Sequence, residues 1–238
     1  MKLDARYADA IPLTKVVVGS RLHGLESDDS DWDYRGVHLH SLKAIISPFR
    51  NLKSTTWFEG DTDNTSYELT EFCRLATQGN ATILEVLFSD IIEETTPIAD
   101  LMRKHALRFI DTDRFVMASQ GYARHQLSKL REFEAVSENS GDRSAKFAVA
   151  YVRVMWQCLE FLKTGDFRCR IAEPLRSQLL DVKYHWDKRM VPSLLQLFDE
   201  LQADVTREWE SATKHKPDLP WIEEFLLSAY AGWIPPIS

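Results

Sequence analysis

The sequence predicts an α+β protein, in which a small β-sheet domain over residues 1–96 is followed by a C-terminal α-helical bundle over residues 97–238. Short β-branched or alternating segments occupy much of the first third of the chain, which is typical of strands. After Pro97 the apolar residues recur at helical spacing through six consecutive segments. The prolyl turn Thr95-Thr96-Pro97 separates the two patterns, so we expect the domain boundary there.

The first third contains four strand candidates and two helix candidates. The strand candidates are Lys15–Val18, Trp32–Leu39, Thr55–Glu59 and Asn64–Leu69. From Leu69 the apolar period becomes helical, and Gly79-Asn80 separates this helix from a second one over Ala81–Phe88.

The second part reads as helices throughout. They are expected over 97–109, 113–133, 144–164, 173–187, 191–213 and 219–230. The segment Ala145–Lys163 is apolar around most of its circumference, which predicts the central helix of the bundle.

The composition excludes several classes of protein. No apolar run approaches the roughly 20 residues that span a bilayer, and the N-terminal segment lacks the apolar core of a secretory signal. The three cysteines are too few and too far apart for a disulfide framework or a zinc knuckle. We therefore expect a cytoplasmic protein without membrane contact.

The charge is unevenly distributed. A net charge of −7 argues against a protein coated for nucleic acid. Residues 101–131, however, carry seven Lys/Arg against two Asp, a local charge of +5. This segment is either a solvated helix face or a basic wall that faces a polyanion.

An acidic stretch follows the first strand candidate. An EF-hand loop that starts at Asp29 would need glycine at its sixth and glutamate at its twelfth position, where the sequence has Tyr34 and His40. A calcium loop of that kind is therefore excluded. Three of the five acidic residues are explained by a solvated polar turn: Glu26, Asp28 and Asp29.

Asp31 and Asp33 need another explanation. Residues two apart on a strand point to the same face of the sheet, and two carboxylates there repel each other unless solvent or a cation lies between them. They are either an exposed pair near a strand end or a divalent metal site. The preceding Gly19-Ser20 favours the metal site, because consecutive N–H groups at such a turn can bind phosphate oxygens. Phosphate-binding turn and paired carboxylates together indicate a site for a metal-bound nucleoside triphosphate.

The stretch GSRLHGLESDDSDWDYRGV, residues 19–37, resembles the predicted nucleotidyltransferases found beside RNA ligases in phages and bacteria. These form part of the DNA polymerase β-type nucleotidyltransferase superfamily, whose signature is a Gly-Ser pair followed by Asp-x-Asp. The resemblance continues in residues 63–72, 79–89 and 153–167, and covers roughly residues 13–185. It implies a small mixed-sheet nucleotidyltransferase domain whose cleft is closed by the helical bundle.

The resemblance also implies a metal centre. Asp31 and Asp33 would hold two Mg²⁺ ions, with Mn²⁺ as an alternative; one ion would bind the triphosphate and the other would lower the pKa of the attacking hydroxyl. A third carboxylate from a neighbouring strand completes such sites. Asp63 is our choice, because its spacing to the following helix fits the family pattern, and Glu68 is the rival.

Further residues are expected to bind the nucleotide. Gly19 and Ser20 would bind the β- and γ-phosphates, and the resemblance places basic residues of the central helix near the triphosphate. The basic candidates are Arg21 and Arg35, which could instead pair with nearby acids, and Lys146 and Arg153, which are seven residues apart on one helix face. The family's His-x-x-Arg reads Ala-Tyr-Val-Arg at 150–153, so its histidine is missing here.

Four more residues near these motifs have local interpretations. Trp32 is expected to pack in the core rather than to stack on a nucleobase. His23 could contact phosphate or be an ordinary loop histidine. Asn80 and Glu85 match the family pattern, but a helix cap and domain packing explain them adequately.

The predicted reaction transfers a nucleoside monophosphate from an NTP to an acceptor hydroxyl, with release of pyrophosphate. The association with RNA ligases favours an RNA or tRNA 3′ end as the acceptor, in RNA repair. Two alternatives stay open: nucleotidylation of a protein or a small molecule, and a catalytically inactive nucleotide-binding or antitoxin-like module.

Overall fold

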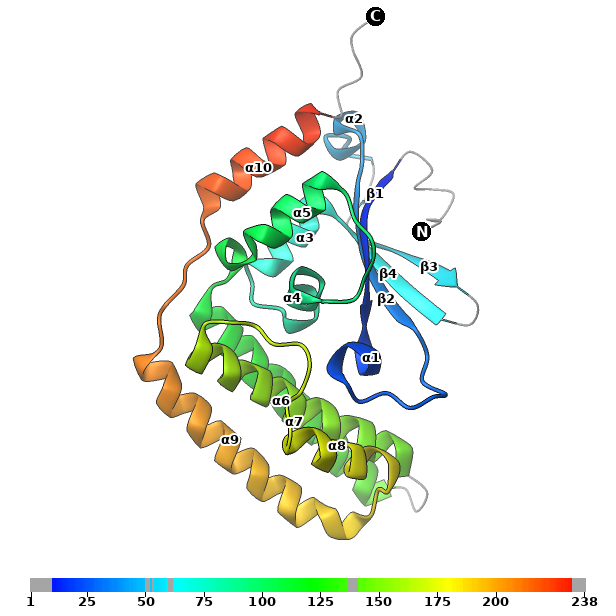
Figure 1. Cartoon of the computed structure of the whole chain (residues 1–238), viewed down its shortest axis with the longest axis vertical. Coiled ribbons are helices and arrows are strands. Elements are labelled where there is room, and N and C mark those ends of the chain that lie inside the picture. The colour runs from blue at the N-terminus through cyan, green and yellow to red at the C-terminus, as the bar shows by residue number, and fades with distance from the viewer. Residues whose placement is uncertain (1–9, 50–51, 53, 60–61, 137–140, 233–238) are drawn as a thin grey trace, which may run out of the picture.

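The computed structural model describes residues 10–49, 52, 54–59, 62–136 and 141–232, with side chains for all of these except 58–59, 62–63, 135–136 and 141–142. A five-stranded mixed sheet is followed by helices (Figure 1), so the predicted α+β class is confirmed. Across the described ranges, no helix is both long and apolar enough to cross a membrane.

The sheet contains the four predicted strands and one more. The strands are β1 (Ile11–Val18), β2 (Asp33–Leu39), β3 (Ser54–Glu59), β4 (Thr62–Glu68) and β5 (Ile92–Glu94), in the order β3-β4-β2-β1-β5. Strand β5 was not predicted, because its three residues are all exposed and carry no apolar alternation. It is identified only by its pairing with β1.

The pairing of the strands brings three chain segments to one end of the sheet. Strands β1 and β2 are antiparallel, with Val18 opposite Asp33, so the end of β1 lies beside the start of β2. Strands β2 and β4 are parallel, with Arg35 opposite Thr65. The starts of β2 and β4 therefore lie at the same end of the sheet, next to the turn that leaves β1.

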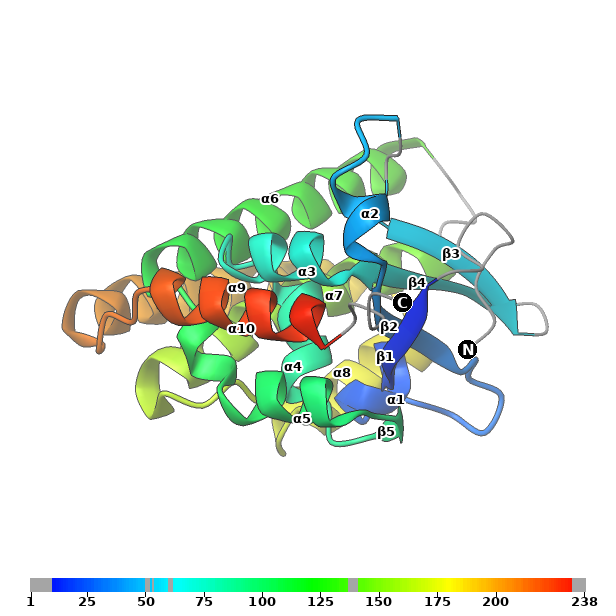
Figure 2. The same cartoon turned by 90° about the horizontal axis from the view of Figure 1, so that it is seen from above.

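Short helices follow the strands. These are α1 (Gly19–His23), α2 (Leu42–Ile45), α3 (Leu69–Ala76), α4 (Ala81–Phe88) and α5 (Pro97–Lys104), of which α1 and α2 were not predicted. Helix α4 has the predicted bounds because the Asn80 side chain caps it, accepting a hydrogen bond from the Thr82 N–H. Helices α3, α4 and α5 lie on one side of the sheet (Figure 2).

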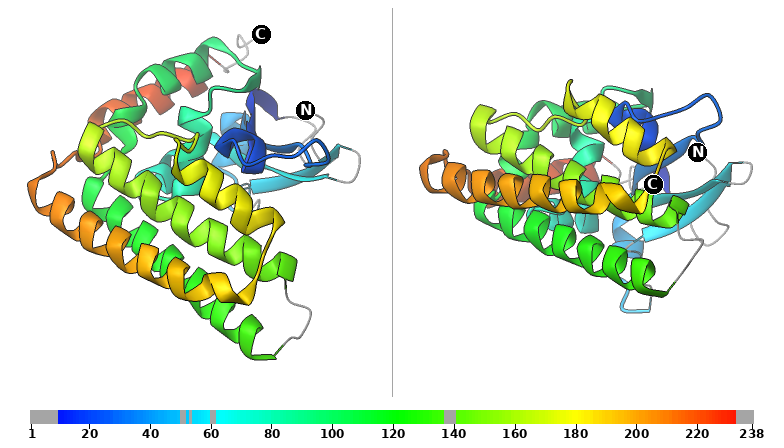
Figure 3. Two further views of the ribbon diagram at one scale, coloured as in Figure 1. Left: turned by 60° about the horizontal axis from the view of Figure 1, so that its bottom comes forward. Right: turned by 90° about the horizontal axis from the view of Figure 1, so that it is seen from below.

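The rest of the chain is helical. It contains the 3₁₀ helix η2 (Ala106–Phe109), α6 (Thr112–Val136), α7 (Gly141–Thr164), α8 (Leu175–Tyr184), the 3₁₀ helix η3 (Lys188–Met190), α9 (Val191–Ser211) and α10 (Leu219–Ala231). Helix α7 packs against α6, α8 and α9 (Figure 3), so its predicted central position is confirmed. The single helix expected over 97–109 is divided at His105 into α5 and η2.

Sheet and bundle share one continuous core. Helix α4 contacts both β1 and α6, and buried apolar residues form one cluster from Leu13 to Tyr230. Helix α5 follows the expected boundary at residue 96 yet contacts β1, and α10 contacts α3. The division after residue 96 stays a prediction. The candidate residues described next lie where the sheet meets the bundle.

Candidate active site at the junction of sheet and bundle

The turn after β1 brings the backbone against a carboxylate. Gly19 has a φ of +69°, and a Cβ added there would lie 2.4 Å from Oδ2 of Asp33. The left-handed backbone conformation favours glycine here, and any larger residue would also push the Asp33 carboxylate away. The turn glycine thus lies against Asp33, one of the two predicted aspartates.

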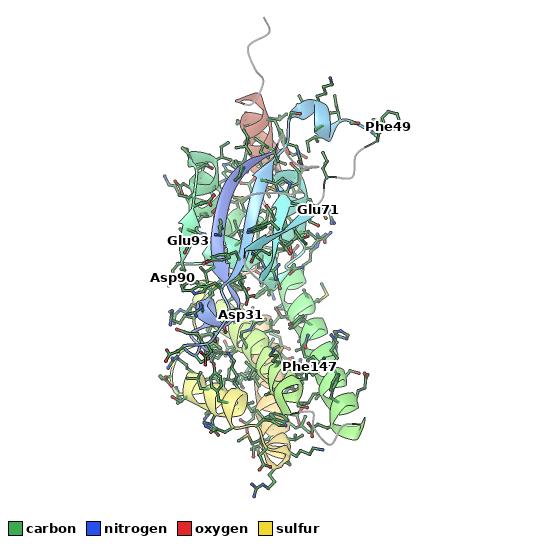
Figure 4. The ribbon with its side chains drawn as sticks, turned by 90° about the vertical axis from the view of Figure 1, so that its right-hand side faces the viewer. Asp31, Phe49, Glu71, Asp90, Glu93 and Phe147 are labelled. Atoms are coloured by element: carbon green, nitrogen blue, oxygen red, sulfur yellow. The ribbon has the colours of Figure 1, made fainter. Side chains whose placement is uncertain are left out.

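The two aspartates of the predicted pair are exposed to different degrees. Asp33 is the first residue of β2 and is half-buried, whereas Asp31 is exposed and precedes the strand. Figure 4 shows Asp31 where the sheet meets the helical bundle. Burial and the neighbouring Asp31 raise the pKa of Asp33, and the positive charges of Arg35 and Lys146 offset only part of this. Burial is thus the main reason that Asp33 is harder to ionise than a free aspartate, and the charge of Asp31 adds to it.

A cavity of about 280 Å³ opens beside Asp33. Seven strands and helices line it: β1, β2, β4, α1, α4, α6 and α7. Its lining residues are Val18, Gly19, His23, Asp33, Tyr34, Arg35, Thr65, Thr82, Glu85, Tyr122 and Arg153. Four of the predicted site residues meet here: Gly19, Asp33, Arg35 and Arg153. Ser20, Arg21, Asp31 and Lys146 do not line this cavity.

A buried ion pair forms the inner wall of the cavity. Nη1 of Arg153 donates to Oε1 of Glu85 at 2.7 Å and to Oε1 of Gln157 at 2.9 Å, and Nε2 of His23 lies 2.9 Å from the same Glu85 oxygen. The side chains of Arg153 and Glu85 are only 12% and 5% exposed. Nη1 of Arg153 also lies 3.2 Å from Nε2 of His23, so α4, α1 and its own helix all contact the guanidinium of Arg153.

The protonation states in this cluster follow from its charges. Burial opposes ionisation of Glu85, but the charges of His23 and Arg153 hold its pKa at about 2. Burial and Arg153, in turn, lower the pKa of His23. Glu85 favours and Arg153 opposes a charge on His23; we assign His23 as neutral, because the guanidinium of Arg153 is permanently charged and already pairs with Glu85. The cluster then has no net charge.

Arg35 is the second guanidinium at the cavity. Its Nη1 donates to the hydroxyl of Tyr67 at 3.1 Å, and its Nε is buried and has no hydrogen-bond partner among the described residues. Arg35 and Arg153 both line the cavity beside Asp33, and of the two only Arg153 is paired there with a carboxylate of the described residues, that of Glu85. This arrangement suits an anion that carries its own cation.

Most of the chain matches one known protein family. The family model of the RNA repair pathway DNA polymerase beta family matches residues 8–226. The chain belongs to this family. No curated protein matches the chain. Among solved structures, it is similar to a nucleotidyltransferase-like protein from Exiguobacterium sibiricum 255-15, with 12% identity over 98% of this chain and 77% of that one. The TM-score of 0.30 is too low for that similarity to carry an argument.

The third carboxylate predicted from the sequence has two candidates. If the pairing of Arg35 with Thr65 continues for two residues, Asp63 stands level with Asp33 on the neighbouring strand, although the Asp63 side chain lies outside the described ones. Glu68 is five residues further along β4, about 16 Å at the usual rise of a strand. Its carboxylate caps α3, accepting a hydrogen bond from the Thr70 N–H at 2.8 Å, and accepts another from the hydroxyl of Tyr230.

The remaining nucleotide-binding candidates of this family member lie around the cavity rather than in it. Nη2 of Arg21 donates to the carbonyl of Ser30 at 2.5 Å, and its guanidinium stacks on Trp32, 4.1 Å from the ring centre. Arg21 thus braces the acidic turn. Lys146 is exposed on α7, close enough for its charge to act on Asp33. Among the described side chains, no group of three His, Cys, Asp or Glu is placed to hold a metal.

The structure corrects one expectation and adds residues that the sequence did not indicate. Trp32 is 45% exposed, so its predicted core position is wrong: it precedes β2 and stacks with Arg21 at the surface. Thr82 and Tyr122 line the cavity from α4 and α6. Nothing in the sequence singles out Tyr122, because a tyrosine on an amphipathic helix has no motif.

Proposed function

We propose that this chain is a metal-dependent nucleotidyltransferase that transfers a nucleoside monophosphate from an NTP to an acceptor hydroxyl. The observation that carries the proposal is the contact of Gly19 with Asp33 in a cavity that also presents Arg35 and Arg153. A backbone turn able to bind phosphate, a carboxylate able to bind a cation and two guanidinium groups converge there. Membership of the RNA repair pathway DNA polymerase beta family supports the same reaction class.

The acidic pair fits a divalent cation. Carboxylate oxygens are the ligands that Mg²⁺ prefers. Burial and then the charge of Asp31 raise the pKa of Asp33, and a cation between the two carboxylates would offset the repulsion between them. Asp31 and Asp33 would hold Mg²⁺, with Mn²⁺ as the alternative and Asp63 as the third ligand. When bound, two such ions supply charge stabilisation at the phosphates and lower the pKa of the attacking hydroxyl.

The protein's own groups orient the reactants. The N–H groups of the Gly19-Ser20 turn and the guanidinium groups of Arg35 and Arg153 would bind the phosphates, with Lys146 at the rim and Arg21 holding the acidic turn in place. The acceptor oxygen attacks the α-phosphorus, the bond from that phosphorus to the bridging oxygen breaks, and pyrophosphate leaves. The hydroxyl proton passes to a carboxylate, for which Asp63 is our candidate.

An RNA or tRNA 3′ end is the proposed acceptor, supported by the family's description as an RNA repair pathway family. The basic segment over 101–131 supports it in part only. Arg103, Arg108 and Arg114 of that segment are bonded within the protein, whereas Arg124 and Arg131 are exposed on α6. A protein or small molecule as the acceptor, and a module without catalysis, are the alternatives that the following experiment separates.

The test is transfer of label from α-labelled NTPs to total RNA in the presence of Mg²⁺. The Asp31→Ala/Asp33→Ala variant should lose transfer, whereas Asp28→Ala/Asp29→Ala, which removes two exposed carboxylates of the same turn, should retain it. Label on the protein itself would support protein nucleotidylation instead of RNA. Tight NTP binding without transfer to RNA, protein or small hydroxylated molecules would overturn the enzymatic proposal in favour of a binding module.

A further inference from the structure

A second cavity adjoins the one beside Asp33. It measures about 290 Å³ and lies between the turn before α4, helix α6 and helix α7. Its lining residues are Gln78, Asn80, Ala81, Thr82, Ala118, Ser119, Tyr122, Arg153 and Val154. Thr82, Tyr122 and Arg153 line both cavities, so the two share a wall. Each is near the lower limit of ligand pockets, about 300 Å³, and the two together lie within their range.

The two cavities differ in charge. The first contains Asp33, Arg35, His23, Glu85 and Arg153. In the second, Arg153 is the one charged side chain of the lining, and it stands at the shared wall. A ligand that extends through both would therefore place its ionic part beside Asp33 and its neutral part beyond Arg153.

The second cavity offers neutral hydrogen-bonding groups. The Asn80 side chain uses its Oδ1 to cap α4, at 3.1 Å from the Thr82 nitrogen, which leaves its amide nitrogen as a donor. Ser119 is 1% exposed, and its Oγ has no hydrogen-bond partner among the described residues apart from the neighbouring thiol of Cys158, a weak one. Buried hydroxyl groups without a strong partner are uncommon in folded proteins and need an explanation.

Tyr122 provides an aromatic surface at the shared wall. It is 40% exposed on α6 although it lines both cavities. Aromatic rings are the usual stacking partners of nucleobases, and backbone or side-chain amides and hydroxyls are the usual donors and acceptors for their edges.

We infer that the second cavity binds the nucleobase of the NTP, with Tyr122 at the ribose and base and with Asn80 and Ser119 on the base edge. The inference rests on the proposed function and deepens it, because it assigns a site to the part of the substrate that the metal and phosphate groups do not contact. Arg153, fixed by Glu85, then marks the division between phosphate and base.

The test compares NTPs with a ligand that has no base. Binding of inorganic tripolyphosphate and of ATP, GTP, CTP and UTP, each with Mg²⁺, is measured by titration calorimetry. The key variant is Ala118→Leu, which fills the second cavity from a residue that does not line the first. The matched control is Ser128→Leu, an exposed position on the same helix.

We expect the best-bound NTP to bind the wild-type chain more tightly than tripolyphosphate. Ala118→Leu should weaken NTP binding by about tenfold or more, with tripolyphosphate affected less than about twofold. Asn80→Ser retains a side-chain cap for α4 but removes the amide, and should change the ratio of affinities among the four NTPs. Circular dichroism and thermal melting establish that each variant is folded, and Asn80→Ser carries the test if Ala118→Leu is not.

Three results would overturn the inference. In the first, tripolyphosphate binds the wild-type chain as tightly as every NTP. In the second, Ala118→Leu weakens tripolyphosphate and NTP equally. In the third, a folded Ala118→Leu binds NTP like Ser128→Leu. Each of these leaves the proposed nucleotidyltransferase intact, whereas failure of the wild-type chain to bind any NTP would overturn both.

Discussion

Replacement of Glu85 by glutamine tests whether a buried ion pair fixes Arg153 at the cavity. Glu85→Gln preserves the size and shape of the side chain but removes its negative charge. The guanidinium of Arg153, 2.7 Å from Oε1 and only 12% exposed, then loses its counter-charge. Neither remaining neighbour supplies one, since Gln157 is uncharged and His23 is neutral.

The expected loss of stability is worked from the pKa of Glu85. A shift from 4.5 to about 2 corresponds to about 3 kcal/mol of stabilisation of the folded state at neutral pH. This is an upper value, because a neutral His23 stabilises the carboxylate of Glu85 less than a charged imidazolium would. Breaking a buried ion pair on one side typically costs about 3–5 kcal/mol, so we expect Glu85→Gln to lose roughly 2–3 kcal/mol.

Urea denaturation of four variants measures this loss and separates its causes. The set is Glu85→Gln, Arg153→Met, the double variant, and Glu160→Gln, a carboxylate of the same helix as Arg153 whose partner Arg168 is half-exposed at 3.4 Å. The double variant should be more stable than Glu85→Gln alone, because no unpaired charge is then buried. Glu160→Gln should change stability by less than about 1 kcal/mol.

Glu85→Gln should also change the pH dependence of stability and the rate of nucleotidyl transfer. Because the folded pKa of Glu85 is depressed, its contribution is fully present above pH 4.5 and is lost as the pH falls towards about 2; Glu85→Gln should therefore approach the wild-type stability only in that acidic window. Loosening of Arg153 should reduce nucleotidyl transfer by about 10–100-fold. A loss below about 1 kcal/mol, or costs of the two single variants that simply add in the double variant, would refute the reasoning.

Three further variants test other parts of the structure. Gly19→Ala adds a Cβ 2.4 Å from Oδ2 of Asp33 at a φ of +69°. It should lower stability by at least about 1–2 kcal/mol in thermal melts and abolish transfer. Wild-type transfer rates would show that the added Cβ does not disturb Asp33. His38 is buried and its pKa is lowered to about 3, so below pH 6.5 the unfolded state takes up a proton and the folded state loses up to about 1.4 kcal/mol per pH unit. His38→Gln lacks this proton uptake. Measured relative to its own stability at neutral pH, it should therefore lose less stability on acidification than wild type. An unchanged acid profile would argue against a neutral His38. Tyr230→Phe removes a donor to the buried Glu68 carboxylate, which should cost about 1.5–3 kcal/mol in urea titrations but leave transfer unchanged; reduced transfer in folded protein would mean that Glu68 serves the site.

The amino-acid sequence by itself determined the features that depend on near neighbours. The fold class, the four main strands and the helix α4 follow from period and caps, which act within a few residues. The same holds for the likeness of Gly19, Asp31 and Asp33 to a nucleotidyltransferase motif, because a glycine turn and two carboxylates two residues apart are local patterns. The choice of Asp63 as the third carboxylate stays a prediction.

Only the tertiary structure decided which groups meet across the chain. The pairing of Arg153 with Glu85 joins residues 68 apart, and that of Tyr230 with Glu68 joins residues 162 apart. No local period encodes such contacts, because they depend on how α4, α7 and α10 pack after they have formed. The exposure of Trp32, the strand β5 and the two cavities at the junction likewise result from packing. The sequence therefore determined which chemical groups are available, and the packing of the bundle against the sheet decided which of the charged groups line the cavity.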